Sequence, residues 1–276
     1  LGKFDSQTLL YNRTVETIRS SRDYTQRLAG AYIRPSHVSD RLAAKNALMN
    51  ILKAKVVAPS DEDQQILMRL TSKTKITISP IPIAESASWD LDAIKKSAEM
   101  AALESSAAGI NWTFAPMVDI SRDARWGRVM EGAGEDPYLG SKIAEARVNG
   151  FQGNNLSLNS TIAACAKHFA AYGFAEAGRD YNTVDIGTST LYNMVFPPFI
   201  AAKNAGVKTF MNSFNELNGI PATGNKYLQR DILKEEWAYD GFIVSDWGSI
   251  TEMIAHGHAK DGEHAAELAL NAGSDM

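Results

Sequence analysis

The chain has 276 residues, more than a common domain of about 100–200 residues and enough for one large α/β barrel, which needs about 250. Its 28 Lys and Arg against 32 Asp and Glu give a net charge of −4, which offers no bulk attraction to nucleic acid or to an anionic membrane. The single cysteine, Cys165, excludes an intrachain disulfide and a thiolate-rich metal site.

No apolar run approaches the roughly 18 residues of a membrane span, so no membrane partner is expected. The N-terminus lacks the basic-then-apolar pattern of a signal peptide, and no signal is expected in this chain. No phosphate-binding glycine loop or dinucleotide fingerprint occurs, so no cofactor is predicted. Aromatic residues are not interleaved with basic runs, and a nucleic-acid partner therefore has no support.

Residues 1–75 are predicted to form an atypical helical and polar N-terminal part, because apolar residues such as Leu42, Leu48 and Ile51 recur at helix-like intervals. Beyond residue 75, short apolar runs alternate with amphipathic stretches, which predicts β–α units around a parallel sheet. The predicted strands are 76–83, 112–118, 161–166, 207–213 and 242–245. The predicted helices are 91–108, 138–152, 188–204, 226–238 and 263–272. No repeat or linker interrupts the chain, so we expect a single domain over residues 1–276.

Polar residues recur directly after four of the predicted strands. They are Asp119, the pair Lys167-His168, Asn215, and the pair Asp246-Trp247. In a parallel α/β barrel the active site is built at this end of the strands. The recurrence therefore predicts a site there.

Asp246 at a strand end suits a carboxylate nucleophile that attacks the anomeric carbon of a sugar, and Trp247 offers an aromatic surface for the sugar ring. Capping of a following helix explains Asp246 equally well. Lys167 and His168 can donate hydrogen bonds to sugar hydroxyls and keep a nearby carboxylate ionised. Taken alone, that pair fits a surface lysine and a hydrogen-bonded core histidine better.

The loop 125–128, followed by Glu131, is dense in both charge signs. Arginine offers a fork of donors for carboxylates or vicinal hydroxyls, whereas an ion-pair network would only stiffen the loop. Both interpretations can hold, because a displayed arginine needs supporting contacts. The spacing of His256, His258 and His264 matches no strong ligand motif, so no metal site is predicted.

Together these residues resemble glycoside hydrolase family 3, in particular its bacterial β-glucosidase branch. The resemblance covers residues 76–276 and includes Lys167-His168 and Ser245-Asp246-Trp247. Its motifs, in chain order, are residues 80–90, 115–119, 122–128, 134–137, 167–173, 218–222 and 241–247.

The resemblance implies a TIM-like (β/α) barrel, irregular or rebuilt over the first 75 residues, and retaining hydrolysis of terminal β-D-glucosyl residues through a covalent glycosyl–Asp intermediate. Asp246 matches the family's nucleophile. The positions that match or adjoin its sugar-binding residues are Arg128, Lys167, His168, Trp247, Glu176 and Tyr181. The substrate would be a β-glucoside or oligosaccharide, and the parent protein would be periplasmic or secreted.

Three departures from the family qualify this expectation. The family carries an aspartate before a His-Gly turn just upstream of residues 80–83, but residues 65–79 contain no acid. Residues 1–60 match the family only faintly. The family's general acid/base comes from a further C-terminal domain, so this chain would need that domain or a partner chain. The alternatives are a truncated or engineered barrel that binds glucose without efficient turnover, and a barrel kept as a scaffold.

Overall fold

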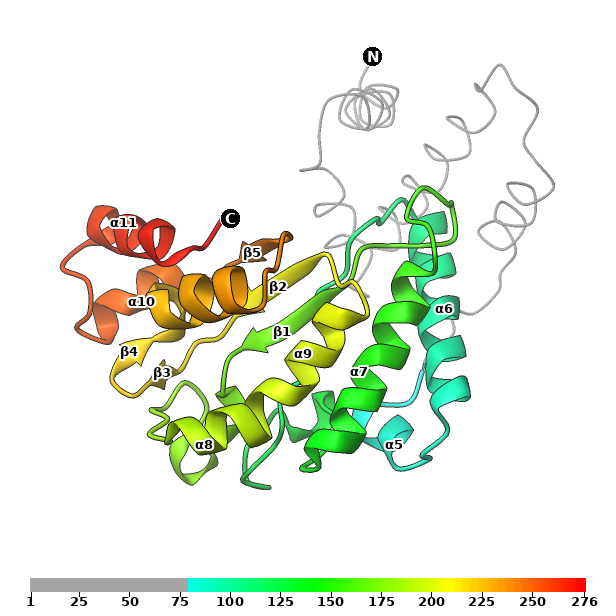
Figure 1. Cartoon of the computed structure of the whole chain (residues 1–276), viewed down its shortest axis with the longest axis horizontal. Helices are drawn as coiled ribbons and strands as arrows, with labels where there is room; N and C mark the ends of the chain where they lie inside the picture. The colour runs from blue at the N-terminus through cyan, green and yellow to red at the C-terminus, as the bar shows by residue number, and fades with distance from the viewer. Residues whose placement is uncertain (1–78) are drawn as a thin grey trace, which may run out of the picture. The chain divides into compact units, whose positions relative to one another are not determined.

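The computed structural model describes residues 79–276 (Figure 1). The chain forms two compact units, one of residues 1–77 with 103–111 and one of residues 78–102 with 112–276. The second unit holds the elements described below, except that residues 103–107 of α6 (Leu91–Ala107) are assigned to the first unit. The helices predicted before residue 72, and the irregular barrel part expected over residues 1–75, lie outside the described residues.

A parallel three-stranded sheet, in the order β1–β2–β5, forms the centre of the second unit. β1 (Cys165–Phe169) pairs with β2 (Thr209–Asn212), which pairs with β5 (Phe242–Val244). Nearly every residue of the three strands is buried, as parallel strands covered by helices require. The prediction of a parallel α/β sheet is therefore confirmed.

The predicted strand 112–118 runs parallel to β1 but forms only isolated bridges. Met117 bridges Lys167, and the Val118 N–H donates to the Lys167 carbonyl at 2.8 Å. Pro116 lies in the middle of this segment and has no N–H to donate, which interrupts a regular ladder. The segment nevertheless delivers the residue after it, Asp119, to the same edge of the sheet as the strand ends.

Helices cover the sheet, and Figure 1 shows α7 (Pro137–Gln152) and α9 (Phe196–Asn204) packed side by side along it. Large aromatic side chains fill the space between these helices and the strands. Phe169 packs edge-on against Phe199, with ring centroids 5.2 Å apart, and both side chains are fully buried. Burial of each such side chain stabilises the fold by about 1.5–3 kcal/mol.

The other predicted helices are confirmed with small changes. They are α6 (Leu91–Ala107), η6 (Tyr227–Glu236, a π-helix) and α11 (Gly262–Ala272). The predicted helix 188–204 is divided into α8 (Thr188–Thr190), the π-helical η4 (Leu191–Val195) and α9. Pro197 and Pro198 explain the division, because proline removes an N–H and crowds the carbonyl of the preceding turn.

Short elements complete the described chain. They are η1 (Val129–Glu131), η2 (Tyr172–Phe174), η3 (Glu176–Gly178), the antiparallel pair β3 (Glu216–Leu217) and β4 (Ile220–Pro221), η5 (Ala222–Gly224) and α10 (Ser249–Ala255). Among the described helices, none is both long and apolar enough to cross a membrane.

The predicted strand 76–83 is wrong over its described residues. Residues 79–81 are not in a strand, and α5 (Pro82–Ser86) occupies the rest. Pro82 stands in the first turn of α5, where a missing N–H is tolerated, whereas proline fits poorly inside a sheet. A short apolar run alone does not distinguish these two structures.

Candidate active site

The carboxyl ends of the strands bring together three residues that are far apart in the sequence: Asp119, His168 and Asp246. His168 Nδ1 lies 2.8 Å from Asp119 Oδ2, and His168 Nε2 lies 3.3 Å from Asp246 Oδ2. The side chains of His168 and Asp119 are 0% and 1% exposed, and that of Asp246 is 15% exposed. The imidazole thus links a buried carboxylate to one that reaches the surface.

A register shift in β1 produces this arrangement. Lys167 pairs with Met211 and Phe169 pairs with Asn212, so His168 is skipped in the ladder to β2. Its free N–H donates instead to Asp119 Oδ2 at 2.9 Å. The prediction that Lys167 and His168 follow the strand end is therefore wrong, because β1 continues through Phe169 and an irregularity re-aims the residue between them.

Asp246 lies two residues beyond β5. The Trp247 N–H donates to Asp246 Oδ1 at 2.6 Å, so both carboxylate oxygens have a nitrogen close by. The N-cap of α10 is Gly248, and no side chain caps that helix start. The alternative that the Asp246 carboxylate caps the following helix is therefore not what the structure shows.

Two exposed aromatic side chains stand close to Asp246. Trp247, its neighbour in the chain, is 91% exposed, so its indole is open to a ligand. Tyr181 is 45% exposed, and its ring centroid lies 4.4 Å from that of Phe214. Burial raises the pKa of Tyr181, and the negative charges of Glu252, Asp180 and Asp246 add to this effect.

Arg128 is held by Glu131 through two charge-assisted hydrogen bonds, and its guanidinium carbon lies 5.5 Å from the ring centroid of Tyr172. The Tyr172 ring in turn packs edge-on against His168, with centroids 5.3 Å apart. The hydrogen bond from Arg128 lowers the pKa of Glu131 against the opposing effect of burial, and the charges of Lys167 and His168 lower it further. Arg128 and Lys167 therefore belong to the same charged cluster as His168.

Glu176 is not brought into this cluster. It is exposed in η3, and its hydrogen bonds within the described residues are made by its backbone, such as the one from Asn182 Nδ2 to its carbonyl at 3.2 Å. Glu252 of α10, which the sequence reasoning missed, interacts electrostatically with Asp246 instead. Its Oε2 is buried with no hydrogen-bond partner in the described part of the chain, and burial raises its pKa. The signal in the sequence was that Glu252 lies six residues after Asp246. The helix that carries Glu252, α10, was not predicted.

Most acids of the loop after Asp119 stabilise the loop itself. Asp123 binds Arg125 at 2.6 Å, and this hydrogen bond lowers the pKa of Asp123 to about 2. Asp136 accepts from the Leu139 N–H at 2.7 Å and caps α7. Asp119, the first acid after the predicted strand 112–118, binds His168 and no loop arginine.

Two of the three C-terminal histidines, His256 and His264, have separate partners. His256 Nδ1 lies 2.9 Å from Glu216 Oε1, and His264 Nδ1 accepts from the Lys260 N–H at 3.2 Å. Within residues 79–276 no group of three or more His, Cys, Asp or Glu side chains is arranged to hold a metal ion.

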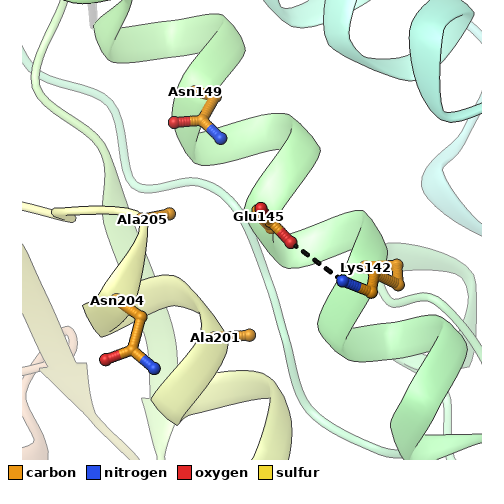
Figure 2. Close-up of a pocket in the computed structure, with 6 residues that line it drawn as sticks. All are labelled: Lys142, Glu145, Asn149, Ala201, Asn204 and Ala205. Carbon is orange, nitrogen blue, oxygen red and sulfur yellow. Dashed lines mark hydrogen bonds and ion pairs between the residues drawn. The ribbon is translucent and has the colours of Figure 1, made fainter.

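A cavity of about 410 Å³ lies between α7 and α9, on the outer helices (Figure 2). It is lined by Lys142, Glu145, Asn149, Ala201, Asn204 and Ala205. None of the candidate site residues lines it, so it is separate from the cluster around Asp246.

The described part of the chain is a parallel α/β sheet with polar residues gathered at its strand ends, the place where α/β folds build their sites. The model of the glycosyl hydrolase family 3 N terminal domain matches residues 37–276, and the chain belongs to this family. The domain has a TIM-like α/β fold, which confirms the predicted fold class. The match begins at residue 37, earlier than the resemblance to residues 76–276 indicated.

Particular relatives agree with the family. The periplasmic β-glucosidase of Salmonella typhimurium is 45% identical over 200 residues, which cover 72% of this chain and 26% of the relative. A β-xylosidase of Formosa agariphila is 38% identical over 205 residues, covering 72% and 28%. The crystal structure of a β-glucosidase from Listeria innocua in complex with glucose matches with a TM-score of 0.70 and 48% identity, covering 72% of this chain and 28% of that one. The chain thus spans about a quarter of the length of these relatives.

Proposed function

We propose that this chain is the barrel part of a retaining β-glycosidase that removes terminal β-D-glucosyl residues from β-glucosides or β-gluco-oligosaccharides. The observation that carries the proposal is the environment of Asp246. Its carboxylate stands beyond β5, accepts from the Trp247 N–H at 2.6 Å and faces His168 Nε2 at 3.3 Å. A fixed carboxylate with nearby donors suits a nucleophile that must stay ionised.

In this mechanism an oxygen of Asp246 attacks the anomeric carbon, and the bond from that carbon to the leaving oxygen breaks. The leaving oxygen takes a proton from a general acid, and a water molecule then hydrolyses the glycosyl–Asp ester with retention of configuration. Lys167 and Arg128 would donate hydrogen bonds to the sugar hydroxyls, whereas His168, which is buried between two carboxylates, would act on Asp246. Trp247 would pack against the sugar ring, because its indole is open to solvent.

Glu176 and Tyr181 remain proposed contacts with the substrate. Tyr181 is the better placed of the two, since its ring is half-exposed and interacts with Asp246, whereas Glu176 is exposed in η3. The relatives are named as β-xylosidases as well as β-glucosidases. Selectivity for glucose is therefore part of the proposal.

The general acid/base is proposed to come from a further C-terminal domain or a partner chain. The relatives are about four times as long as the matched segment, which is compatible with such a domain. The second candidate function is glucose binding without efficient turnover, favoured by Glu176, whose exposed side chain makes no hydrogen bond or ion pair within the described residues. The parent protein is proposed to act in the periplasm or outside the cell, in line with the name of the Salmonella relative.

The test is covalent labelling of the chain with a fluorosugar that carries an activated leaving group. The ester should map to the peptide that contains Asp246, and Asp246→Gly should remain unlabelled. On an activated aryl β-glucoside this variant should lose at least about 10³-fold in turnover. A label on another carboxylate would reject the nucleophile. Stabilisation by glucose without any label would support the binding function instead.

A further inference from the structure

His168 lies between two carboxylates and is completely buried. Its Nδ1 is 2.8 Å from Asp119 Oδ2, and its Nε2 is 3.3 Å from Asp246 Oδ2. The Nε2 contact has the length of an ion pair, but its geometry is not that of an aligned hydrogen bond. The attraction there is therefore electrostatic, and it depends on the charge of the imidazole.

Asp119 holds His168 at two points, the backbone and the ring. Its Oδ2 accepts from both the backbone N–H of His168, at 2.9 Å, and the ring Nδ1. An ionised carboxylate is only an acceptor, so Nδ1 carries a proton. Asp119 Oδ1 is buried with no hydrogen-bond partner in the described part of the chain. A carboxylate kept from water in this way needs a cation next to it.

The other nitrogen of His168 faces Asp246. A bare Nε2 would place a nitrogen of negative partial charge 3.3 Å from a carboxylate oxygen, and the two would repel each other. A proton on Nε2 turns this repulsion into an attraction. Imidazole is a stronger base than a carboxylate, so that proton stays on Nε2.

The remaining groups around His168 do not supply the missing positive charge. Glu131 adds a third carboxylate, and its charge is matched by Arg128, which binds it at 2.7 Å. Lys167 adds one cation, and Tyr172 presents an uncharged ring edge. Two carboxylates then face one lysine, and a cationic His168 balances the cluster.

We propose that Asp119 is a positioning residue that keeps the imidazole of His168 protonated on both nitrogens, so that an Nε2–H faces Asp246. The charge state of His168 follows from its surroundings and is independent of any activity. Its consequence, stabilisation of Asp246 as an ionised nucleophile, rests on the proposed function.

Nitrogen NMR of the imidazoles tests the charge state directly, on the full chain labelled with ¹⁵N-histidine at neutral pH. Signals of His168 are assigned by their loss in His168→Gln. Both ring nitrogens should be protonated in the wild type, and Nε2 should become bare in Asp119→Asn. The matched control is Glu216→Gln, which removes the carboxylate from the other described His–carboxylate pair, at His256. It should leave the His168 signals unchanged.

A bare Nε2 in the wild type, or two protonated nitrogens in Asp119→Asn, would overturn the proposal. Thermal unfolding reports whether Asp119→Asn folds. Should it not fold, the wild-type spectrum decides alone: two protonated nitrogens support the proposal and a bare Nε2 overturns it.

The functional consequence is measured by the rate at which the fluorosugar labels Asp246. Asp119→Asn should slow labelling by about 10–100-fold, the usual effect of removing the carboxylate that orients a functional histidine. A wild-type chain that is never labelled but shows a doubly protonated His168 would reject the proposed function and leave the charge state standing.

Discussion

Two of the three guanidinium nitrogens of Arg128 donate to the carboxylate of Glu131, Nε to Oε1 at 2.7 Å and Nη2 to Oε2 at 2.9 Å. This two-point contact leaves only Nη1 outside the ion pair and fixes the plane of the guanidinium above the Tyr172 ring. Arg128 therefore reaches the site as a pre-oriented donor, and part of its charge is already neutralised.

The Arg128–Glu131 pair should make stability depend on pH. The hydrogen bond from Arg128 lowers the pKa of Glu131 below its ordinary value of 4.5, so the folded state binds this proton less readily than the unfolded state. The stabilisation is complete above 4.5 and is lost as the pH falls through the lower folded value. Glu131→Gln should cost under about 1 kcal/mol at neutral pH, since the pair is partly exposed.

Chemical denaturation of the wild type and Glu131→Gln across the acid range measures this difference. The difference in the free energy of unfolding between the wild type and Glu131→Gln should shrink below about pH 4, where carboxylates begin to take up protons. A difference that stays constant from neutral pH to strongly acidic pH would show that the pair does not stabilise the fold.

Lys167→Ala should weaken the binding of glucose by about 1–3 kcal/mol, the contribution of one charge-assisted hydrogen bond. Lys167 is half-buried on β1 and interacts electrostatically with Glu131, which places it in the charged cluster. Competitive inhibition by glucose is the measurement. Lys260→Ala is the control, because its side chain is 74% exposed. If glucose inhibits the wild type and Lys167→Ala equally, Lys167 does not bind the sugar and is a surface lysine.

Substrates whose leaving groups need no proton should be turned over far better than cellobiose by this chain alone. Attack by Asp246 does not require the acid that the proposal assigns to another domain. A dinitrophenyl glucoside should react readily, and azide should speed release of the glycosyl–enzyme because it needs no base. The products to measure are dinitrophenolate and glycosyl azide.

Efficient cellobiose hydrolysis with a bell-shaped pH profile would contradict this expectation and place an acid/base within the 276 residues. Glu252 would then be the first residue to replace, ahead of Glu176. Burial raises the pKa of Glu252, and the charge of Asp246 adds to that effect. Glu252→Gln should abolish the hydrolysis of cellobiose in that case and spare that of the dinitrophenyl glucoside.

The ion pair between Arg147 and Glu85 should dominate the electrostatic stability of the second unit. Their side chains are 11% and 9% exposed, and the Ser97 hydroxyl donates to Glu85 Oε1 at 2.8 Å. Glu85→Gln leaves a buried arginine without its partner charge and should cost about 3–5 kcal/mol in the free energy of unfolding. The control is Glu99→Gln, which breaks a half-exposed pair with Lys95 and should cost less than about 1 kcal/mol. If Glu85→Gln and Glu99→Gln lower the free energy of unfolding by similar amounts, the buried pair does not stabilise the fold more than the half-exposed pair.

The sequence alone determined the elements that depend on local pattern. Helix periodicity placed α6, α7 and α11 within one or two residues, and apolar runs located β2 and β5, whereas the run 161–166 overlaps β1 only at its last two residues. Because parallel strands end at one edge, residues that follow them in the sequence are brought together in space. This is why Asp246 and His168 were predicted to belong to one site.

Only the tertiary structure decided the partners of those residues. Asp119 could have paired with several nearby arginines, yet its oxygen binds a histidine 49 residues away. That choice depends on the register shift in β1 and on burial, neither of which leaves a periodic trace in the sequence. Glu252 was missed for the same reason. Charge pairs are selected by distance and desolvation in the folded chain, whereas spacing along the chain records only which residues could meet.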